Sequence, residues 1–332
     1  MTAPRVAETA DWRPAASLDV LRLRAGLLAR VREHFAREGV LEVETPALVR
    51  APVTDVHLET LRVVDDGTTA DSAVGFLQTS PEYAMKRLLC AGAPDLYQVA
   101  HVYRAGERGR RHNPEFTMVE WYRHGFDHHA LMRDVEALVR AVLDGHRETA
   151  PSVFVAYRDA FRAVVGLDPL DAERSDLVAA LHGLGLDVPA SVRSAPDRDE
   201  VLDLAMGTLV ADSFARDRLT FVYDFPASQA ALAQLRGPVA SRFEAFFGPL
   251  ELANGFHELG DAAEQRRRFS ADAAARQRLG RPARALDERF LAALAHGLPA
   301  CAGVALGFDR LVMVAAGAAS IDEVMAFPFE RA

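Results

Sequence analysis

The stretch that decides the fold reads Arg104-Ala105-Gly106-Glu107-Arg108-Gly109-Arg110-Arg111-His112-Asn113-Pro114-Glu115-Phe116. It separates two segments, 96–104 and 115–123, that are rich in Tyr, Val, Phe and Trp and are therefore predicted to be strands. The glycines, the asparagine and the proline between them favour a loop. We expect a long-looped antiparallel hairpin whose loop carries four arginines and one histidine.

Such a loop is suited to gripping a polyphosphate, because guanidinium forks match phosphate oxygens and glycines let the backbone come close. Taken alone, a basic loop is more often simply solvated, and that alternative stays open. On the outgoing strand, Phe116, Met118, Glu120 and Tyr122 share one face. That face suits a ligand with an amine and a hydrocarbon stem, although a half-buried sheet face explains it nearly as well.

Upstream of the hairpin, apolar residues recur at helical spacing from Leu21 to Phe35, and Gly39 can end that helix. Residues 40–45 alternate like a strand and stop at Pro46, which cannot donate to a ladder. Downstream, residues 127–215 are mostly helical by composition and show no recognisable chemistry. We interpret an Arg-rich segment, 266–289, as a solvated helical face.

Three further strands are predicted at 219–223, 242–247 and 250–259, and Gly248-Pro249 joins the last two. If this turn is tight, position 246 opposes 251 and Glu244 lies diagonal to Glu251. The two carboxylates would then lie within reach of one Mg²⁺ ion.

On the last of these strands, Asn254, Phe256 and Glu258 share one face, which presents an amide, an aromatic wall and a carboxylate. Gly255 marks a bulge or a close ligand approach. Glutamates on an exposed strand edge are common, so this pattern alone is a weak indication of a site.

Near its end the chain reads Gly303-Val304-Ala305-Leu306-Gly307 and enters an apolar helix at Phe308. Free backbone N–H groups and the helix dipole favour an anion there, and Arg310 adds a full positive charge. A turn of this kind is by itself more often only a tight connection. Antiparallel hairpins with the helices set aside predict an α+β domain, mainly an antiparallel sheet flanked by helices.

The composition is that of a folded protein that does not bind polyanions over its whole surface. Half of the 332 residues are hydrophobic, and the net charge is −9, which repels nucleic acid and anionic membranes. Cys90 and Cys301 match no metal or redox spacing and are expected to be reduced thiols. Residues 1–16 do not resemble a secretory signal, and no apolar run is long enough for a membrane span. We expect a cytoplasmic protein without membrane contact.

Taken together, the order and spacing of these segments resemble the three signature motifs of class II aminoacyl-tRNA synthetases. Motif 1 falls at about 20–46, motif 2 at about 97–123 and motif 3 at about 303–316. The resemblance implies a lead at 1–14 and one catalytic domain at 15–332. Within the class, the chain most resembles the lysine branch, because residues 79–82, 111–118 and 251–259 are nearly identical to sequence motifs of that branch.

Inside the lysine branch the chain most resembles the elongation factor P–(R)-β-lysine ligases. It begins almost at the motif 1 helix, which leaves no room for an anticodon-binding domain. Glu120-Trp121-Tyr122-Arg123 has the form found in the ligases, and Ala305 stands where the synthetases generally have glycine.

The resemblance implies a role for each matching residue. Arg104 and Arg310 are the implied catalytic residues, since they contact the carboxylate and phosphates. The implied ATP-binding set is Arg104, Gly106, Glu107, His112, Asn113, Glu251, Leu252, Gly307 and Arg310. The implied amino-acid pocket is Ser80, Pro81, Glu82, Glu120, Tyr122, Asn254, Phe256, Glu258 and Ala305. Glu244 and Glu251 are the implied Mg²⁺ ligands. The family usually has Arg-x-Glu at the start of motif 2, whereas this chain has Gly106 there, and we expect Glu107 to replace that glutamate.

The implied reaction joins (R)-β-lysine or lysine to AMP at the expense of ATP and passes it to a lysine of elongation factor P. A homodimer is expected, since motif 1 builds a two-fold interface in the family, and tRNA is not expected as a partner. Two alternatives remain: a truncated lysyl-tRNA synthetase that charges tRNA, and a catalytically inactive regulatory protein of synthetase type. Inactive proteins typically lose the motif 2 and motif 3 arginines, and both are present here.

Overall fold

The computed structural model describes residues 12–65, 73–194, 197–282 and 284–332, so that most of the expected lead at 1–14 lies outside the described residues. The main sheet has the strand order β1-β5-β6-β12-β11-β10-β8-β7, with β9 paired to β10. Its strands are β1 (Leu41–Glu42), β5 (Leu96–Tyr103), β6 (Glu115–His124), β7 (Val153–Ala156), β8 (Leu219–Pro226), β9 (Leu235–Arg236), β10 (Val239–Phe247), β11 (Leu250–His257) and β12 (Cys301–Gly307).

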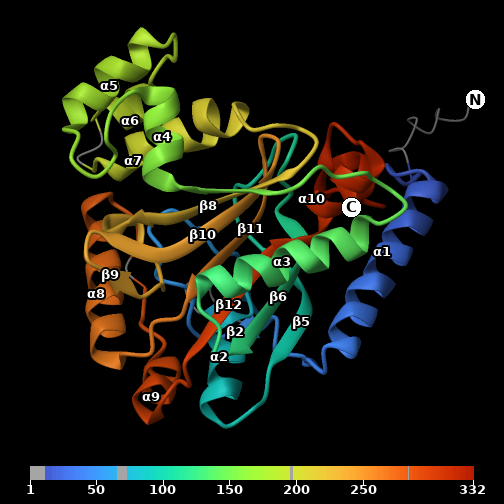
Figure 1. The fold of residues 1–332 in the computed structure, drawn as a ribbon. Helices are drawn as coiled ribbons and strands as arrows, with labels where there is room; N and C mark the ends of the chain where they lie inside the picture. Colours follow the sequence, from blue (N-terminus) through green and yellow to red (C-terminus); the bar gives the residue numbers. More distant parts are fainter. Residues whose placement is uncertain (1–11, 66–72, 195–196, 283) are drawn as a thin grey trace, which may run out of the picture.

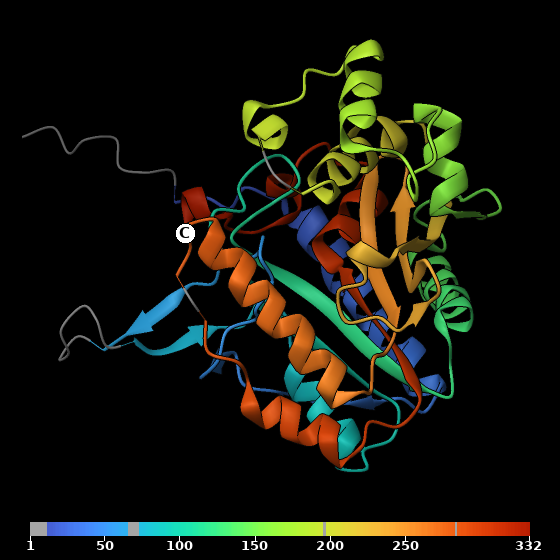
Figure 2. The ribbon, with the colours of Figure 1, turned by 90° about the vertical axis from the view of Figure 1, so that its left-hand side faces the viewer.

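Helices surround this sheet, and a second sheet of three short strands stands beside it. The helices are α1 (Leu18–Arg37), α2 (Glu82–Cys90), α3 (His128–Leu143), α4 (Tyr157–Val165), α5 (Arg174–Gly183), α6 (Ala190–Ser194), α7 (Asp199–Ala205), α8 (Ala262–Arg278), α9 (Glu288–His296) and α10 (Phe308–Ala316). The small sheet has the order β2 (Leu48–Val49), β4 (Ala73–Leu77) and β3 (Arg62–Val64). Figure 2 shows β3 and β4 reaching away from the main sheet.

The predicted hairpins are confirmed in position and in pairing. Strands β5 and β6 pair antiparallel from Leu96 opposite Tyr122 to Tyr103 opposite Glu115. Strands β10 and β11 pair antiparallel across Gly248-Pro249, with Phe246 opposite Glu251 as expected for a tight turn. The main sheet is therefore mostly antiparallel, and the α+β fold class is confirmed.

One sequence prediction needs correction, and one that is confirmed needs an addition. The strand expected at 40–45 is assigned only at Leu41–Glu42, and it pairs parallel with β5, because the chain turns away toward Pro46 after one more backbone hydrogen bond, from Val43 N to Tyr97 O (2.9 Å). The stretch 127–215 contains a strand as well as helices. This strand, β7, is four residues long and pairs parallel with β8 at the sheet edge, and so short a run carries little periodicity.

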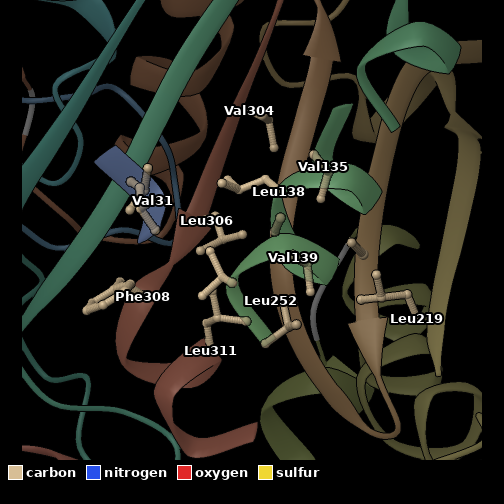
Figure 3. Packing of buried hydrophobic residues seen from close by; sticks show 14 of the residues in the cluster. Val31, Val135, Leu138, Val139, Leu219, Leu252, Val304, Leu306, Phe308 and Leu311 are labelled. Carbon is tan, nitrogen blue, oxygen red and sulfur yellow. The ribbon is translucent and has the colours of Figure 1, made fainter. Parts of the chain in front are cut away.

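The two faces of the main sheet have different tasks. Alternate residues such as Val119, Val304 and Leu306 point into the largest core, which α1, α3 and α10 cover. Figure 3 shows Val135, Leu138 and Val139 of α3 beside Val304 and Leu306 in this core, and Figure 1 shows α3 lying across the sheet. The residues between them in sequence point to the other face, where the polar groups gather.

A separate helical layer, α4 to α7, lies against one edge of the sheet (Figure 1). Its own core joins Phe161, Leu181 and Leu202 to Val222 and Phe246 of the sheet. Helix α8 bears most of the Arg-rich segment, and the prediction of a solvated helical face needs one correction. Arg276 is only 1% exposed. It turns inward and donates to Glu59 and to the carbonyls of Asp55 and Val56, in the loop that precedes β3.

Both cysteines are buried free thiols, as expected. Among the described residues, none of the helices combines the length and the apolar character that a bilayer crossing requires.

Candidate active site

The site occupies the polar face of four adjacent strands, β6, β12, β11 and β10, where residues line up across the strands in two rows. In the first row Glu120 lies opposite Ala305, which lies opposite Asn254, which lies opposite Glu244. The second row, two residues further along each strand, joins Tyr122, Gly303, Phe256 and Arg242 in the same manner. Motif residues that are far apart in sequence are therefore neighbours on one surface.

At one end of this surface, three side chains hold one another through hydrogen bonds. Ser80 Oγ donates to Glu120 Oε2 (2.7 Å), and Tyr122 OH donates to Glu120 Oε1 (2.7 Å). Ser80 Oγ also accepts from the backbone N–H of Glu82 (3.0 Å) at the start of α2. Pro81 occupies the N-cap position of that helix, so the Ser80-Pro81-Glu82 turn fixes where the Glu82 carboxylate enters the pocket.

Two more charged residues complete this acidic end. Lys86, one turn after Glu82 on α2, lies 2.6 Å from Glu82 Oε1 and 2.6 Å from Glu258 Oε2. Gly303 lies underneath, and a Cβ there would overlap the Tyr122 ring and Glu258 Oε1. Glycine is required at this position because the backbone of β12 touches both side chains.

Two carboxylates of the acidic end, Glu120 and Glu258, hold protons more tightly than exposed carboxylates do. Burial raises the pKa of Glu120 to about 7, and the nearby Glu82 carboxylate adds to this. Burial likewise raises the pKa of Glu258 to about 8, with the ammonium of Lys86 opposing the shift and Glu82 favouring it. A pocket of three crowded carboxylates favours a ligand with more than one positive charge.

At the other end of the surface, Arg310 ties motif 3 to motif 2. It lies in the first turn of α10, directly after the N-cap Gly307. Its Nη1 donates to the carbonyl of Glu251 (2.8 Å), and its Nη2 lies 2.8 Å from His112 Nε2. Burial, followed by the charge of Arg310, lowers the pKa of His112, so the neutral imidazole accepts this hydrogen bond.

Arg104 lies at the start of the motif 2 loop with a free donor. Its guanidinium stacks over the Phe116 ring at 5.0 Å and lies 3.5 Å from Glu107 Oε1. Its buried Nε has no hydrogen-bond partner among the described residues. Gly106 has φ +80°, a left-handed conformation that glycine adopts readily. The orphaned donor and the open space beside Gly106 fit an anionic ligand.

Asn113 is placed differently from the other ATP-binding candidates. It is buried, its Nδ2 donates to the carbonyl of Glu115 (2.6 Å), and its Oδ1 accepts from the N–H of Phe329 (3.0 Å). Both ends of the amide are therefore used by the backbone, and in this structure Asn113 shapes the loop.

The two proposed Mg²⁺ ligands come together through an irregularity in β11. The register shifts between Ala245 and Phe246, so that Glu244 lies opposite Asn254 while Phe246 lies opposite Glu251. The extra residue, Leu252, is buried in the core, and Glu251 turns to the polar face, where its Oε2 lies 3.6 Å from Arg310 Nη1.

This arrangement fits a hard cation, because a buried carboxylate, Glu244, lies near a second one, Glu251, whose side chain is 41% exposed. Burial raises the pKa of Glu244 to about 7, Arg242 opposes the shift and Glu251 favours it. Among the described residues, the one group of three close metal-ligand side chains lies elsewhere, at His128, His129 and Asp224. Both oxygens of Asp224 already accept from Arg236, which makes that group an ion-pair cluster.

Sequence reasoning missed Lys86 and Arg242. Arg242 donates to Glu244 Oε1 (2.5 Å) and Asn254 Oδ1 (3.3 Å), and it stacks over Phe225 at 4.4 Å. Its place two residues before Glu244 on a strand was a usable signal, because such residues share a face. Gly255 was interpreted as a bulge or a ligand contact, but its missing Cβ makes room for the Phe243 ring in the core.

Comparison with known proteins agrees with this geometry. The family model of the class II tRNA synthetases (D, K and N) matches residues 6–331. The chain is 49% identical over 327 residues to the elongation factor P–(R)-β-lysine ligase of Vibrio cholerae, which covers 97% of this chain and 99% of that protein. It is 46% identical to the enzyme of the same name from Pasteurella multocida, over 98% of this chain and 99% of that protein.

Proposed function

Because the chain belongs to the class II tRNA synthetases (D, K and N) and, within them, to the elongation factor P–(R)-β-lysine ligases, we propose the following function for its site. The protein is an ATP-dependent ligase that attaches (R)-β-lysine to elongation factor P. One observation supports the roles that we assign to the residues. The polar face of the sheet is continuous and has carboxylates at one end and arginines at the other. Glu120 and Phe116, beneath Arg104, are four residues apart on β6, which places the two ends about 13 Å apart.

The acidic end receives the two ammonium groups of the substrate. Glu82, Glu120 and Glu258 supply the negative charge, and Tyr122 and Ser80 fix the Glu120 carboxylate by hydrogen bonds. Ala305 and Asn254, in the same row as Glu120, and Phe256, in the row of Tyr122, line the strands beside the carboxylates and contact the hydrocarbon stem. The substrate carboxylate then lies toward Arg104.

The arginine end receives ATP. Arg104 contacts the substrate carboxylate and the α-phosphate, and Arg310 and His112 contact the terminal phosphates, while Glu107 takes the place of the usual motif 2 glutamate. Glu244 and Glu251 would hold Mg²⁺, which supplies positive charge against the phosphates. Such electrostatic positioning is the main way in which proteins assist nucleotidyl transfer.

The reaction has two steps. A carboxylate oxygen of β-lysine attacks the α-phosphorus in line and displaces pyrophosphate, which gives the acyl adenylate. The uncharged amine of an acceptor lysine then attacks the acyl carbon, an amide bond forms, and AMP leaves while the amine proton passes to solvent. No covalent bond to the enzyme is required.

The electrostatics of the described surface support a protein acceptor over tRNA. The net charge is −9, and the arginines of the 266–289 segment are largely paired. Arg266 pairs with Glu288 (2.5 Å), Arg267 and Arg268 pair with Glu264 (2.6 and 2.8 Å), and Arg276 and Arg284 pair with Glu59 (3.0 and 2.9 Å). A surface neutralised in this way offers few phosphate contacts. We also propose that the enzyme acts as a homodimer through its motif 1 region.

The test has two arms. Exchange of labelled pyrophosphate into ATP is measured with lysine, (R)-β-lysine and (S)-β-lysine, and we expect the highest rate with (R)-β-lysine. The enzyme, ATP, Mg²⁺ and labelled (R)-β-lysine are then incubated with elongation factor P of the same organism or with total tRNA. We expect label on the protein. Label on tRNA with none on the protein would support a truncated lysyl-tRNA synthetase, and absence of exchange with all three amino acids would support an inactive regulatory protein.

A further inference from the structure

One basic residue in the acidic end differs from all others in the chain. Of the 38 lysines and arginines, Lys86 is the only lysine. Its side chain is buried, with 1% of it exposed. A chain that uses arginine at every other basic position has a compact ammonium at this one, inside the pocket.

The surroundings of Lys86 account for the choice of side chain. Its Nζ lies 2.6 Å from carboxylate oxygens on two different elements, Glu82 of α2 and Glu258 beyond the end of β11. Met85 and Leu89 of α2 and Tyr122 of β6 fill the adjoining core cluster. A planar guanidinium is larger and needs its donors satisfied in a fixed fork, whereas an ammonium acts as a point charge between two oxygens.

The charged groups around Lys86 can be counted element by element. The titratable groups that face it are Glu82 and Cys90 of α2, Glu120 and Tyr122 of β6, Glu258, and Cys301 of β12. Burial raises the pKa of Cys301 to about 12 and that of Tyr122 well above its ordinary value, so both stay neutral. The groups around Lys86 that can become negatively charged are therefore the three carboxyl groups of Glu82, Glu120 and Glu258.

We propose that Lys86 is a positioning residue of the amino-acid pocket, a built-in ammonium that holds the Glu82 and Glu258 side chains in place and that leaves two negative charges uncompensated when all three carboxyl groups of the pocket are ionised. Two is the number of ammonium groups on lysine and on β-lysine. The proposal rests on the proposed function, and it adds that the pocket selects diamino acids by charge count as well as by shape.

Removal of this ammonium has a predictable effect. Buried carboxylates without a counter-charge take up protons instead of staying ionised. Lys86→Met is therefore expected to bind (R)-β-lysine on the order of 30-fold more weakly near pH 7, the usual scale for breaking a buried charge pair. Affinity for ATP should not change, because the arginine end contains none of these groups.

The proposal predicts two changes in the affinity for (R)-β-lysine that would not occur if Lys86 only stabilised the fold. The affinity of Lys86→Met for (R)-β-lysine should recover as the pH rises to about 9, because the carboxylates then ionise without help. The double variant Lys86→Met/Glu82→Gln, which removes one negative charge together with the positive one, should bind (R)-β-lysine several-fold more tightly than Lys86→Met at neutral pH.

Calorimetric titration with (R)-β-lysine and with ATP, at several pH values, measures these effects. Arg87→Met is the matched control, since it removes an exposed cation from the next position of the same helix, and it should bind both ligands normally. Unchanged affinity of Lys86→Met for (R)-β-lysine would overturn the inference, as would a loss that neither higher pH nor the second substitution relieves. A wild-type protein that binds neither lysine nor β-lysine would remove the proposed function as well.

A measurement on the unaltered protein keeps the proposal testable if Lys86→Met does not fold. Labelling with ¹⁵N-lysine gives a single side-chain amine signal, because the chain has one lysine. We expect an ammonium signal that persists at pH values where exposed ammonium protons exchange away, and that shifts on addition of unlabelled (R)-β-lysine but not of ATP. A neutral amine at pH 7, or a signal that saturating (R)-β-lysine leaves in place, would contradict the proposal.

Discussion

Single residues at the arginine end do two tasks each. Arg310 would contact phosphate, and in the structure it also joins the motif 2 loop to β11 through His112 and the Glu251 carbonyl. Arg104 keeps a buried Nε free and is held in place by Phe116. Both side chains are thus oriented before any ligand arrives, which is the condition for strong electrostatic stabilisation of a transition state.

Arg310→Ala and Arg104→Ala are therefore each expected to lower the rate of pyrophosphate exchange by about 10²–10³, the usual cost of losing one such contact. The fold should survive, because neither side chain lies in the apolar core. Arg108→Ala is the control, since Arg108 is an exposed residue of the same loop paired with Glu330. Near-normal exchange in a folded Arg310→Ala protein would remove Arg310 from the site.

Ala305 lies between Glu120 and Asn254 in the row that crosses the sheet, where it would face the proposed substrate. Its methyl group takes space that a glycine would leave beside the substrate backbone, and one misplaced methyl is worth about 1–3 kcal/mol in selectivity. Ala305→Gly is expected to shift preference toward α-lysine. The ratio of kcat/KM values in pyrophosphate exchange with (R)-β-lysine and α-lysine measures this, and an unchanged ratio would place selectivity in other side chains.

The raised pKa values of Glu120 (about 7) and Glu258 (about 8) predict a pH dependence. In the unfolded chain these groups ionise at their ordinary value of 4.5. Between that value and about pH 8 the folded protein holds protons that the unfolded chain has lost, so the stability of the free enzyme falls as pH rises. Substrate ammonium groups need the ionised carboxylates, so affinity for (R)-β-lysine rises over the same window.

Thermal unfolding with and without (R)-β-lysine checks this prediction. The increase in Tm that the substrate causes should be larger at about pH 8 than at about pH 6. Glu258→Gln should reduce both the increase and its dependence on pH. A substrate effect of the same size at both pH values would mean that these carboxylates do not bind the amines.

Among the structural elements, α8 anchors a loop that supports the site. Arg276 of α8 donates to Glu59 (3.0 Å) and to the carbonyls of Asp55 (3.1 Å) and Val56 (3.3 Å). The carbonyl of Glu59 in turn accepts from the N–H of Ala105 in the motif 2 loop (2.8 Å). One buried guanidinium therefore connects a distant helix to the residue after Arg104.

Arg276→Met is expected to lower the free energy of unfolding by about 1–3 kcal/mol, because it leaves buried carbonyl groups without donors. Urea denaturation measures the change. Arg278→Met, an exposed position on the same helix, is expected to leave stability nearly unchanged. Equal unfolding midpoints for the two variants would show that α8 does not hold the loop through Arg276.

The long elements could be predicted from the sequence, and the short ones could not. Helix α1 and the β5–β6 hairpin have strong periodicity or turn residues, and both were predicted within a few residues. Strand β7 and the bulge at Leu252 depend on pairing partners far away in sequence, so no local pattern announces them. Glu258 is predicted to lie in the pocket because it belongs to a family motif. Its partner Lys86 is not, because the ion pair joins residues far apart in sequence and Lys86 alone looks like an ordinary helical lysine.

At the scale of the whole molecule, α1 and the segments on either side of it leave apolar side chains uncovered. Trp12 is 77%, Leu18 is 66% and Leu41 is 48% exposed in the single chain. Figure 1 shows α1 along one side of the molecule. Leu18 and Leu41 lie near the two ends of α1, so a contact along this helix would cover both, and a two-fold contact between identical chains is the commonest kind.

Light scattering coupled to gel filtration is expected to give twice the 36.2 kDa mass of one chain. Leu18→Glu should shift the distribution toward monomers, because it buries a charge in the contact. Leu184→Glu, which alters an exposed leucine at the end of α5, should stay dimeric. A wild-type protein of single-chain mass would refute the proposed dimer.

The solitary buried lysine also bears on self-modification. An enzyme that makes an acyl adenylate keeps an acylating reagent on its own surface, and reagents of this kind attack primary amines. Here the only side-chain amine in the printed sequence is sealed inside the pocket, and the outer basic groups are guanidinium ions, which stay protonated and do not attack. Escaped adenylate consequently finds no lysine of its maker to mark, and the β-lysyl groups are kept for the lysine of another protein.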